Sequence, residues 1–380
     1  MIPVNIALKL NLDFNDLNKN IVNNKINFNE NHLPHITLLQ FFTEVNNIRV
    51  IQNSLKDIDI KLNIEEYYLK ITKYDQEKYI YKIQIKSEAL KKLHLLIFNK
   101  FKKYIQIPKI LENFGEEINN KLIPTTILNY YLDSSEKNYD PHITIGISDD
   151  LSEFKFSENI KINDINLYRI GDNGTAMPLH KQDVFYFAHR INTTENLKKI
   201  PKKYGIELDL RDYGKELMLE HDPFTGGERF EDFLKSYDKS SIILNIKSER
   251  IEYKVLELLK KFNITEYFFL DSSFPMIFTL SKEGEKNIAI RFSEYESIDS
   301  VLLMKNRVKW VWVDCFNNFP LNQENYKKII DAGLKICLVS PELQKHNIER
   351  INEFKTIIYK NNFKIDAICT KIYNIDKWNL

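Results

Sequence analysis

The tetrapeptide Pro-His-Ile-Thr occurs twice in the chain and combines two side chains that suit phosphate chemistry. The first copy contains His35 and Thr37, and the second contains His142 and Thr144. In a β-strand, side chains two positions apart project from the same face, so each histidine shares a face with its threonine. If the two strands lie side by side, one imidazole can accept a proton from an attacking hydroxyl, the other can protonate the leaving oxygen, and the hydroxyls can hold the phosphoryl oxygens. The repeat predicts a metal-free phosphodiester site; the alternative is two ordinary strands with partly exposed histidines.

A second set of polar residues occurs in the C-terminal half. Glu207 and Asp209 are two positions apart in a predicted strand, so both carboxylates point to one face. Two buried carboxylates are costly unless a cation lies between them, and Mg²⁺ and Ca²⁺ prefer such oxygen ligands. Asn245, on the next predicted strand, can supply a third oxygen. The set predicts a divalent metal site, Mg²⁺ or Ca²⁺; the alternative is an ion-pair network of the two acids with Arg190 or Arg211.

Two histidines and two cationic side chains accompany these carboxylates. His189 ends the strand before them, and His221 follows shortly after. Lys247 is two positions after Asn245 and shares its face, where an ammonium group can approach a phosphate. We expect Lys247 and Arg190 to bind substrate.

The elements that must position the first set form a mixed α+β pattern with an antiparallel rhythm. We expect strands at 2–12, 35–39, 58–72, 77–86, 140–148 and 162–170, and helices at 44–57 and 87–119. A Gly-, Asn- and Pro-containing loop at 171–182 is the best domain boundary. The predicted domains are therefore 1–180 and 183–380.

After residue 183 short apolar strands alternate with helical patterns. We expect strands at 184–190, 205–211, 241–247, 266–271, 287–292, 308–315, 335–340 and 365–372, with helices at 249–263, 321–333 and 346–362. Eight strands with intervening helices predict a (β/α)8 barrel, whose active site gathers at the strand ends. Possible lining residues at later strand ends are Asp271, Arg291 and Asp314.

The bulk composition excludes some classes of partner. A formal net charge of +1 gives no broad field for nucleic acid. No apolar run is long enough to span a membrane, and the N-terminus does not resemble a signal peptide. Cys315, Cys337 and Cys369 lie in apolar segments without metal-ligand spacing, which is typical of reduced core thiols. We expect a cytoplasmic protein.

The two His-x-Thr motifs resemble those of the 2H phosphoesterase superfamily, which includes 2′-5′ RNA ligase-like and cyclic phosphodiesterase families. The resemblance covers roughly residues 1–180. It implies a bilobal α+β fold and metal-independent hydrolysis of 2′,3′-cyclic or 2′-5′ phosphodiesters. It also implies that His35 and His142 are the acid and base and that Thr37 and Thr144 bind phosphate.

The segment from His189 through GIELDLR to His221 resembles the glycerophosphodiester phosphodiesterase and phospholipase C-like barrels, in a form closer to sphingomyelinase D. The resemblance implies that His189 and His221 are the acid and base and that Glu207 and Asp209 bind the metal. Two departures stand out. Ile191 replaces the glycine of His-Arg-Gly, and Asn245 stands where a third acid is usual.

Together the two resemblances imply a bifunctional phosphodiesterase. The substrate can be a small molecule, a lipid head group, a saccharide phosphate or an RNA end. The alternative is that one domain alone is catalytic and the other is a degenerate module that binds a phosphorylated ligand or RNA.

Overall fold

The computed structural model describes residues 1–10, 20–26, 33–60, 62, 64, 66–75, 78–106, 138–156, 160–170, 176–179, 183–378 and 380. The chain divides into two compact units, Met1–His180 and Lys181–Leu380. Among the described residues, no helix is both long and apolar enough to cross a membrane. The predicted loop at 171–182 falls mostly outside the described residues.

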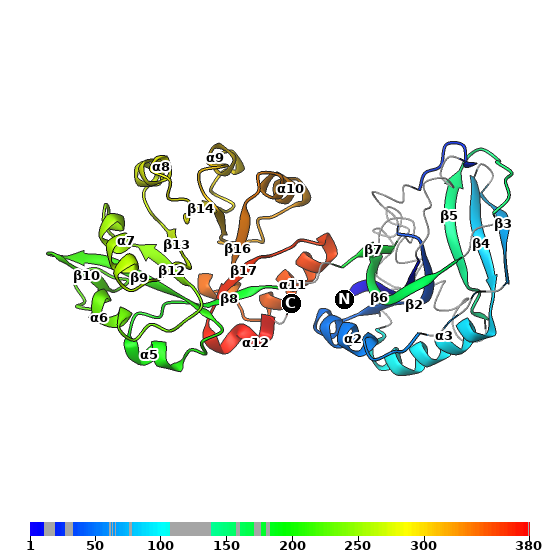
Figure 1. Cartoon of the computed structure of the whole chain (residues 1–380), viewed down its shortest axis with the longest axis horizontal. Coiled ribbons are helices and arrows are strands. Elements are labelled where there is room, and N and C mark those ends of the chain that lie inside the picture. The colour runs from blue at the N-terminus through cyan, green and yellow to red at the C-terminus, as the bar shows by residue number, and fades with distance from the viewer. Residues whose placement is uncertain are drawn as a thin grey trace. The chain divides into compact units, whose positions relative to one another are not determined.

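The first unit contains two antiparallel sheets (Figure 1). One has the order β2-β1-β6-β7 and consists of β1 (Ile2–Leu10), β2 (His35–Thr43), β6 (Ile162–Ile170) and β7 (Ala176–Pro178). The other has the order β3-β4-β5 and consists of β3 (Glu66–Asp75), β4 (Lys78–Lys86) and β5 (His142–Ser148). The helices are η1 (Val45–Asn47), α2 (Ile48–Leu55), α3 (Glu88–Phe101) and η2 (Lys102–Tyr104). Each Pro-His-Ile-Thr copy thus begins an edge strand of its own sheet.

Two predicted boundaries in this unit are wrong. The helix expected at 87–119 ends at Phe101, because the chain then turns to pair with β2: Gln106 N donates to Phe42 O at 2.7 Å. Residues 107–119 lie outside the described part. The strand expected from residue 58 begins at Glu66, because the turn after α2 continues through a hydrogen bond from Ile58 N to Leu55 O.

The second unit is built on a closed ring of eight parallel strands. These are β8 (Phe185–Ala188), β9 (Gly205–Tyr213), β12 (Ile242–Ile246), β13 (Tyr267–Leu270), β14 (Ala289–Phe292), β15 (Trp310–Val313), β16 (Lys335–Val339) and β17 (Ala367–Thr370). Apart from β13, each pairs in parallel with the next, and β17 pairs with β8. A single parallel bridge, Phe269 to Ile288, joins β13 to the segment before β14. All eight strands match predicted segments, although each is trimmed or extended at its ends.

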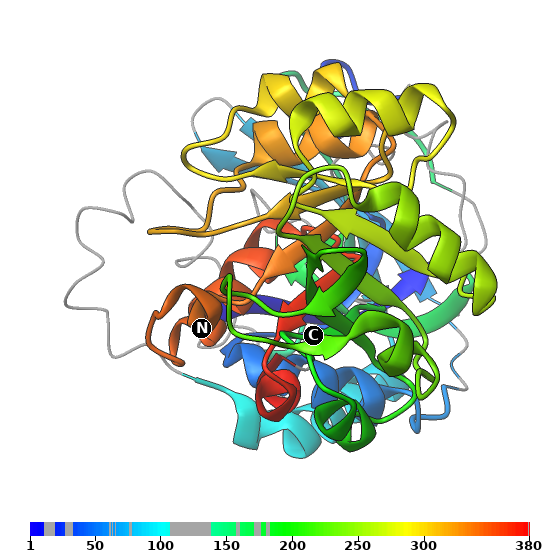
Figure 2. The ribbon, with the colours of Figure 1, turned by 90° about the vertical axis from the view of Figure 1, so that its left-hand side faces the viewer.

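Helices connect successive strands and lie outside the ring (Figures 1 and 2). They are α5 (Thr194–Lys199), α6 (Phe230–Leu234), α7 (Glu252–Lys261), α8 (Phe274–Lys282), α9 (Ile298–Leu303), α10 (Gln323–Asp331), α11 (Arg350–Asn361) and α12 (Ile375–Trp378), with 3-10 turns η7 (Pro341–Gln344) and η8 (Ile372–Asn374). A feature that the sequence did not indicate is an antiparallel extension of β9 by β10 (Glu216–Leu219) and β11 (Glu228–Arg229).

The inside of the ring is an apolar core. Its buried members come from most of the strands: Phe187, Ile243, Phe268, Leu270, Ala289, Trp312, Cys337, Val339, Ala367 and Cys369. The three cysteines are free and buried, and burial raises the pKa of the Cys337 and Cys369 thiols well above the usual value. The core fills the ring below the carboxyl ends of the strands, where the polar residues gather.

Candidate active sites

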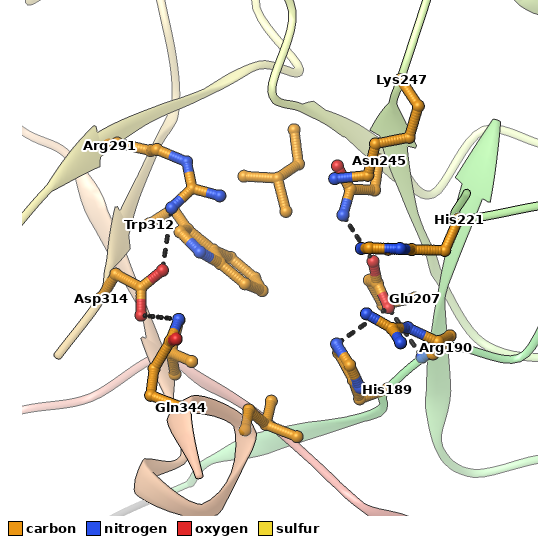
Figure 3. Close-up of a pocket in the computed structure, with 13 residues that line it drawn as sticks. His189, Arg190, Glu207, His221, Asn245, Lys247, Arg291, Trp312, Asp314 and Gln344 are labelled. Atoms are coloured by element: carbon orange, nitrogen blue, oxygen red, sulfur yellow. Dashed lines mark hydrogen bonds and ion pairs between the residues drawn. The ribbon is translucent and has the colours of Figure 1, made fainter. Parts of the chain in front are cut away.

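A cavity of about 210 Å³ opens at the carboxyl ends of the ring strands. Figure 3 shows its labelled side chains in two groups that face each other across it. One group consists of His189, Arg190, Glu207, His221, Asn245 and Lys247, and the other of Arg291, Trp312, Asp314 and Gln344. The structure therefore brings together most of the second predicted set, and Asp209, though not in the cavity wall, lies directly behind it through ion pairs described below.

The two carboxylates of β9 are almost fully buried, each with 1% of its surface exposed. Glu207 accepts hydrogen bonds at both oxygens, from Asn245 Nδ2 (2.8 Å) and from the backbone N of Arg190 (2.7 Å). Asp209 accepts one from Asn192 Nδ2 at 2.9 Å, and Asn192 Oδ1 in turn accepts from the backbone N of Asp209. Burial raises the pKa of both carboxyls, and the charge of Glu207 raises that of Asp209 further.

His189 is held by a lysine from the last strand of the ring. Lys371 Nζ lies 2.9 Å from His189 Nδ1. Because an ammonium group only donates, Nδ1 is the acceptor and the ring proton is on Nε2, which lies 3.8 Å from Glu207 Oε2. Burial, with the charges of Lys371 and Arg190, lowers the pKa of His189 to about 3. His189 is therefore neutral at physiological pH and offers an Nε2–H donor.

His221 has the opposite kind of partner. Its Nδ1 lies 2.8 Å from the Asp222 carboxylate, and its side chain is 39% exposed. A carboxylate at Nδ1 accepts that proton and leaves Nε2 as the basic nitrogen. Arg211 fixes the backbone beside it by donating to the carbonyl of His221 from Nε (3.1 Å) and Nη2 (2.9 Å) and to that of Lys247 from Nη1. Arg211 therefore holds backbone carbonyls in place. The ion-pair network considered as the alternative to a metal site had paired Arg211 with Glu207 and Asp209.

A chain of alternating charges crosses the cavity. Lys247 Nζ lies 3.1 Å from Asp271 and 3.8 Å from Asp209. Arg291 binds Asp271 through a two-pronged contact at 2.6 and 3.0 Å and reaches Asp314 at 2.8 Å. Gln344 donates to the other Asp314 oxygen. Burial opposes ionisation of Asp271, but the Arg291 hydrogen bonds and charge outweigh it and lower its pKa.

The predicted metal site does not fit the side chains around it. Three of the four oxygens of Glu207 and Asp209 already accept hydrogen bonds, and the fourth, Asp209 Oδ1, faces the Lys247 ammonium. Across the described residues, no group of three His, Cys, Asp or Glu side chains is arranged to hold a metal. The one feature that favours a metal is Asn245 Oδ1, which is buried without a hydrogen-bond partner.

In the first unit, the two His-x-Thr copies have matching local geometry. His35 Nδ1 lies 2.7 Å from Leu33 O, and His142 Nδ1 lies 2.9 Å from Asp140 O, in each case two residues upstream. A carbonyl only accepts, so both neutral imidazoles carry their proton on Nδ1. Ile36 and Ile143, between histidine and threonine, are fully buried, as the alternation predicts.

The two histidines begin two neighbouring strands of this unit. Strands β2 and β5 contact each other. Burial and the charge of Lys82 lower the pKa of His142 to about 4, and the charge of His35 adds to this effect. Burial also lowers the pKa of His35. Tyr139 links the copies, since its hydroxyl donates to Thr37 O at 2.8 Å.

Three contributors were missed by reasoning from the sequence. Lys371 lies near the end of the last predicted strand and directly follows β17, and only closure of the ring brings it to His189. Asn192 was noted as part of a motif without a role. Lys82 lies opposite Thr144 in the β4–β5 register, and its alternation with the buried Tyr81 and Ile83 was the signal available. His94, a third histidine of this unit, is buried, and its Nδ1 lies 2.6 Å from Leu38 O.

Comparisons with known proteins give limited similarity. No protein-family model matches the chain, and no curated protein matches it. A glycerophosphodiester phosphodiesterase from Agrobacterium tumefaciens str. C58 matches in structure with 13% identity and a TM-score of 0.37, covering 49% of this chain and 96% of that one. A glycerophosphoryl diester phosphodiesterase from Parabacteroides distasonis ATCC 8503 matches with 13% identity and a TM-score of 0.39, covering 53% and 88%. Similarity this low carries no argument about activity, so any assignment of chemistry must come from the side chains described above.

We expect His142 to titrate with a pKa of about 4 in an NMR pH titration of the folded chain. Its signal is assigned by its loss in His142→Gln. Because the Lys82 charge opposes protonation, Lys82→Met raises this pKa toward the unperturbed 6.5, whereas Lys78→Met at the exposed start of β4 leaves it unchanged. A His142 pKa near 6.5 in the unsubstituted protein would contradict the described burial.

We expect Arg291→Met to destabilise the second unit by about 3–5 kcal/mol, because it leaves the buried Asp314 carboxylate without its cation and removes one of the two cations beside Asp271. All three tryptophans, Trp310, Trp312 and Trp378, lie in this unit, so fluorescence in a urea titration reports its unfolding.

The matched control is Arg229→Met, which removes an ion pair whose partners are about half exposed. This change costs at most about 1 kcal/mol. Equal losses in the two variants would show that the charge chain across the cavity contributes no special stability.

Proposed function

We propose that the second unit is a phosphodiesterase with a (β/α)8 barrel fold and that its active site is the cavity at the carboxyl ends of the ring strands. The observation that carries this proposal is the different pairing of the two histidines that line one cavity. His221 has a carboxylate at Nδ1, which leaves Nε2 as the acceptor nitrogen, and His189 has an ammonium group there, which leaves the ring proton on Nε2. One ring is thus suited to accept a proton and the other to donate a hydrogen bond.

In the proposed reaction, the diester phosphate lies beside the cationic side chains of Lys247 and Arg190. His221 Nε2 removes the proton from the attacking hydroxyl, and the Asp222 carboxylate stabilises the imidazolium that forms. His189 Nε2–H donates to a phosphoryl oxygen as negative charge develops there. The bond to the leaving oxygen breaks as the new P–O bond forms; a water molecule protonates the departing alkoxide, and the His221 imidazolium returns its proton to the hydroxide that results. Glycerophosphodiesters are the substrate class we favour, in line with the two names among the structural matches.

A second function is proposed for the first unit, supported by the matching geometry of the two His-x-Thr copies. There His35 and His142 both present Nε2 as a base when neutral, and Lys82 adds a cation beside them. We infer a metal-independent site for a 2′,3′-cyclic or 2′-5′ phosphodiester, with Thr37 and Thr144 as phosphate ligands. A lowered pKa keeps a histidine neutral, as the general base must be. The histidine that acts as the acid must be protonated, and the negative charge of a bound phosphate would stabilise that form.

Two assays on the full chain separate the units. Bis(p-nitrophenyl) phosphate has a leaving group that departs without a proton, so it tests the barrel base alone, and a 2′,3′-cyclic nucleotide tests the first unit. We expect His221→Gln to lower kcat for the aryl diester about 100-fold or more and to leave cyclic-nucleotide hydrolysis unchanged. His142→Gln has the reverse effect.

The matched control is His346→Gln, a histidine of the second unit that contacts Cys315 O and Arg350 away from the cavity. It leaves both activities unchanged. If one activity is absent in the unsubstituted protein, the unit concerned is a binding module and the chain has a single active site. If both activities depend on the same histidine, the assignment of two independent sites is wrong.

A further inference from the structure

The cation positions of the barrel cavity are already filled by side chains. Asp209 has Arg190 Nε at 3.6 Å and Lys247 Nζ at 3.8 Å. The same Lys247 ammonium lies 3.1 Å from Asp271. The ammonium group therefore lies between the carboxylates of Asp209 on β9 and Asp271 after β13. A positive charge at this position compensates both.

Lys247 is placed there by the fold. It follows Asn245 by two positions at the end of β12, and its backbone N donates to Leu210 O of β9 at 2.9 Å. Its carbonyl accepts from Arg211 Nη1 at 3.1 Å, so the backbone is held on both sides. Its side chain has 18% of its surface exposed, and it lines the cavity wall (Figure 3).

The oxygens that a metal would need are engaged elsewhere. Glu207 accepts from Asn245 Nδ2 and the backbone N of Arg190, Asp209 Oδ2 accepts from Asn192, and Asp209 Oδ1 faces the Lys247 ammonium. A divalent cation would have to share these oxygens with donors already in place, and Asn245 turns its amide nitrogen toward Glu207. The Lys247 ammonium, 3.8 Å from Asp209, also repels a divalent cation at that carboxylate.

We propose that Lys247 takes the place of the divalent cation in the barrel, so that this site binds and cleaves its phosphodiester without a metal. The inference rests on the proposed function of the barrel. The ammonium group and the guanidinium of Arg190, whose side chain is 44% exposed at the mouth, neutralise the phosphoryl oxygens. The displacement is the one described above: one P–O bond forms, one breaks, and the proton taken by His221 returns through water to the leaving oxygen.

The first test is binding of Mn²⁺ to the full chain after dialysis against a chelator, measured by isothermal titration calorimetry. We expect no binding in the unsubstituted protein and no loss of aryl diesterase activity in EDTA. Lys247→Glu adds a third carboxylate beside Glu207 and Asp209, and we expect it to bind Mn²⁺ and to gain thermal stability from it. Lys247→Gln is the matched control, which binds none.

The activity of the variants gives a second test. Lys247→Gln lowers kcat/KM about 100-fold, and Lys247→Arg, which keeps the charge, restores part of the loss. Mn²⁺ binding to the unsubstituted protein that Asp209→Asn abolishes would overturn the proposal, as would activity that EDTA removes and Mn²⁺ restores. If the barrel has no diesterase activity at all, the proposed function fails, and the Mn²⁺ titration still decides whether lysine occupies the metal position.

Discussion

A carboxylate that loses its water must receive hydrogen bonds or an opposite charge in exchange, and Glu207 and Asp209 are both 1% exposed. Their compensation comes from separate parts of the chain. Asn192 belongs to the loop after β8, while Asn245 and Lys247 belong to β12 and its end. The two acids are satisfied only when β8, β9 and β12 are in register. The polar cluster and the closure of the ring are therefore mutually dependent.

The need of buried charges for partners of opposite charge also explains the row of ion pairs across the cavity. Lys247 contacts Asp271 as well as Asp209. Asp271 also binds Arg291, and Arg291 binds Asp314. Each member is paired within the protein, and the two imidazoles stand beside this network with different partners. His189 faces an ammonium group and His221 a carboxylate, so the two imidazoles carry their protons on different nitrogens. An anionic diester entering the cavity meets donors that are already oriented.

The sequence predicted the elements well where one apolar pattern decides them. All eight ring strands and the Glu207–Asp209 alternation follow from period-two patterning, as does the shared face of His35 and Thr37. The prediction from sequence failed where a contact with a residue distant in the chain determines the structure. The helix expected beyond Phe101 ends because β2 captures Gln106, and Lys371 reaches His189 only through closure of the ring. The metal site predicted at Glu207, Asp209 and Asn245 stays a prediction, and the sequence does not show that Lys247 and Arg190 lie within 4 Å of Asp209.

The most direct measurement is anomalous diffraction from crystals of the full chain soaked with tungstate, a phosphate analogue, and with Mn²⁺. If Lys247 and Arg190 serve an anionic diester without a metal, a tungstate peak lies in the cavity between His189, His221 and Lys247, and no Mn²⁺ peak lies beside the carboxylates. A Mn²⁺ peak between Glu207 and Asp209, with the Lys247 ammonium displaced from Asp209, would contradict this assignment.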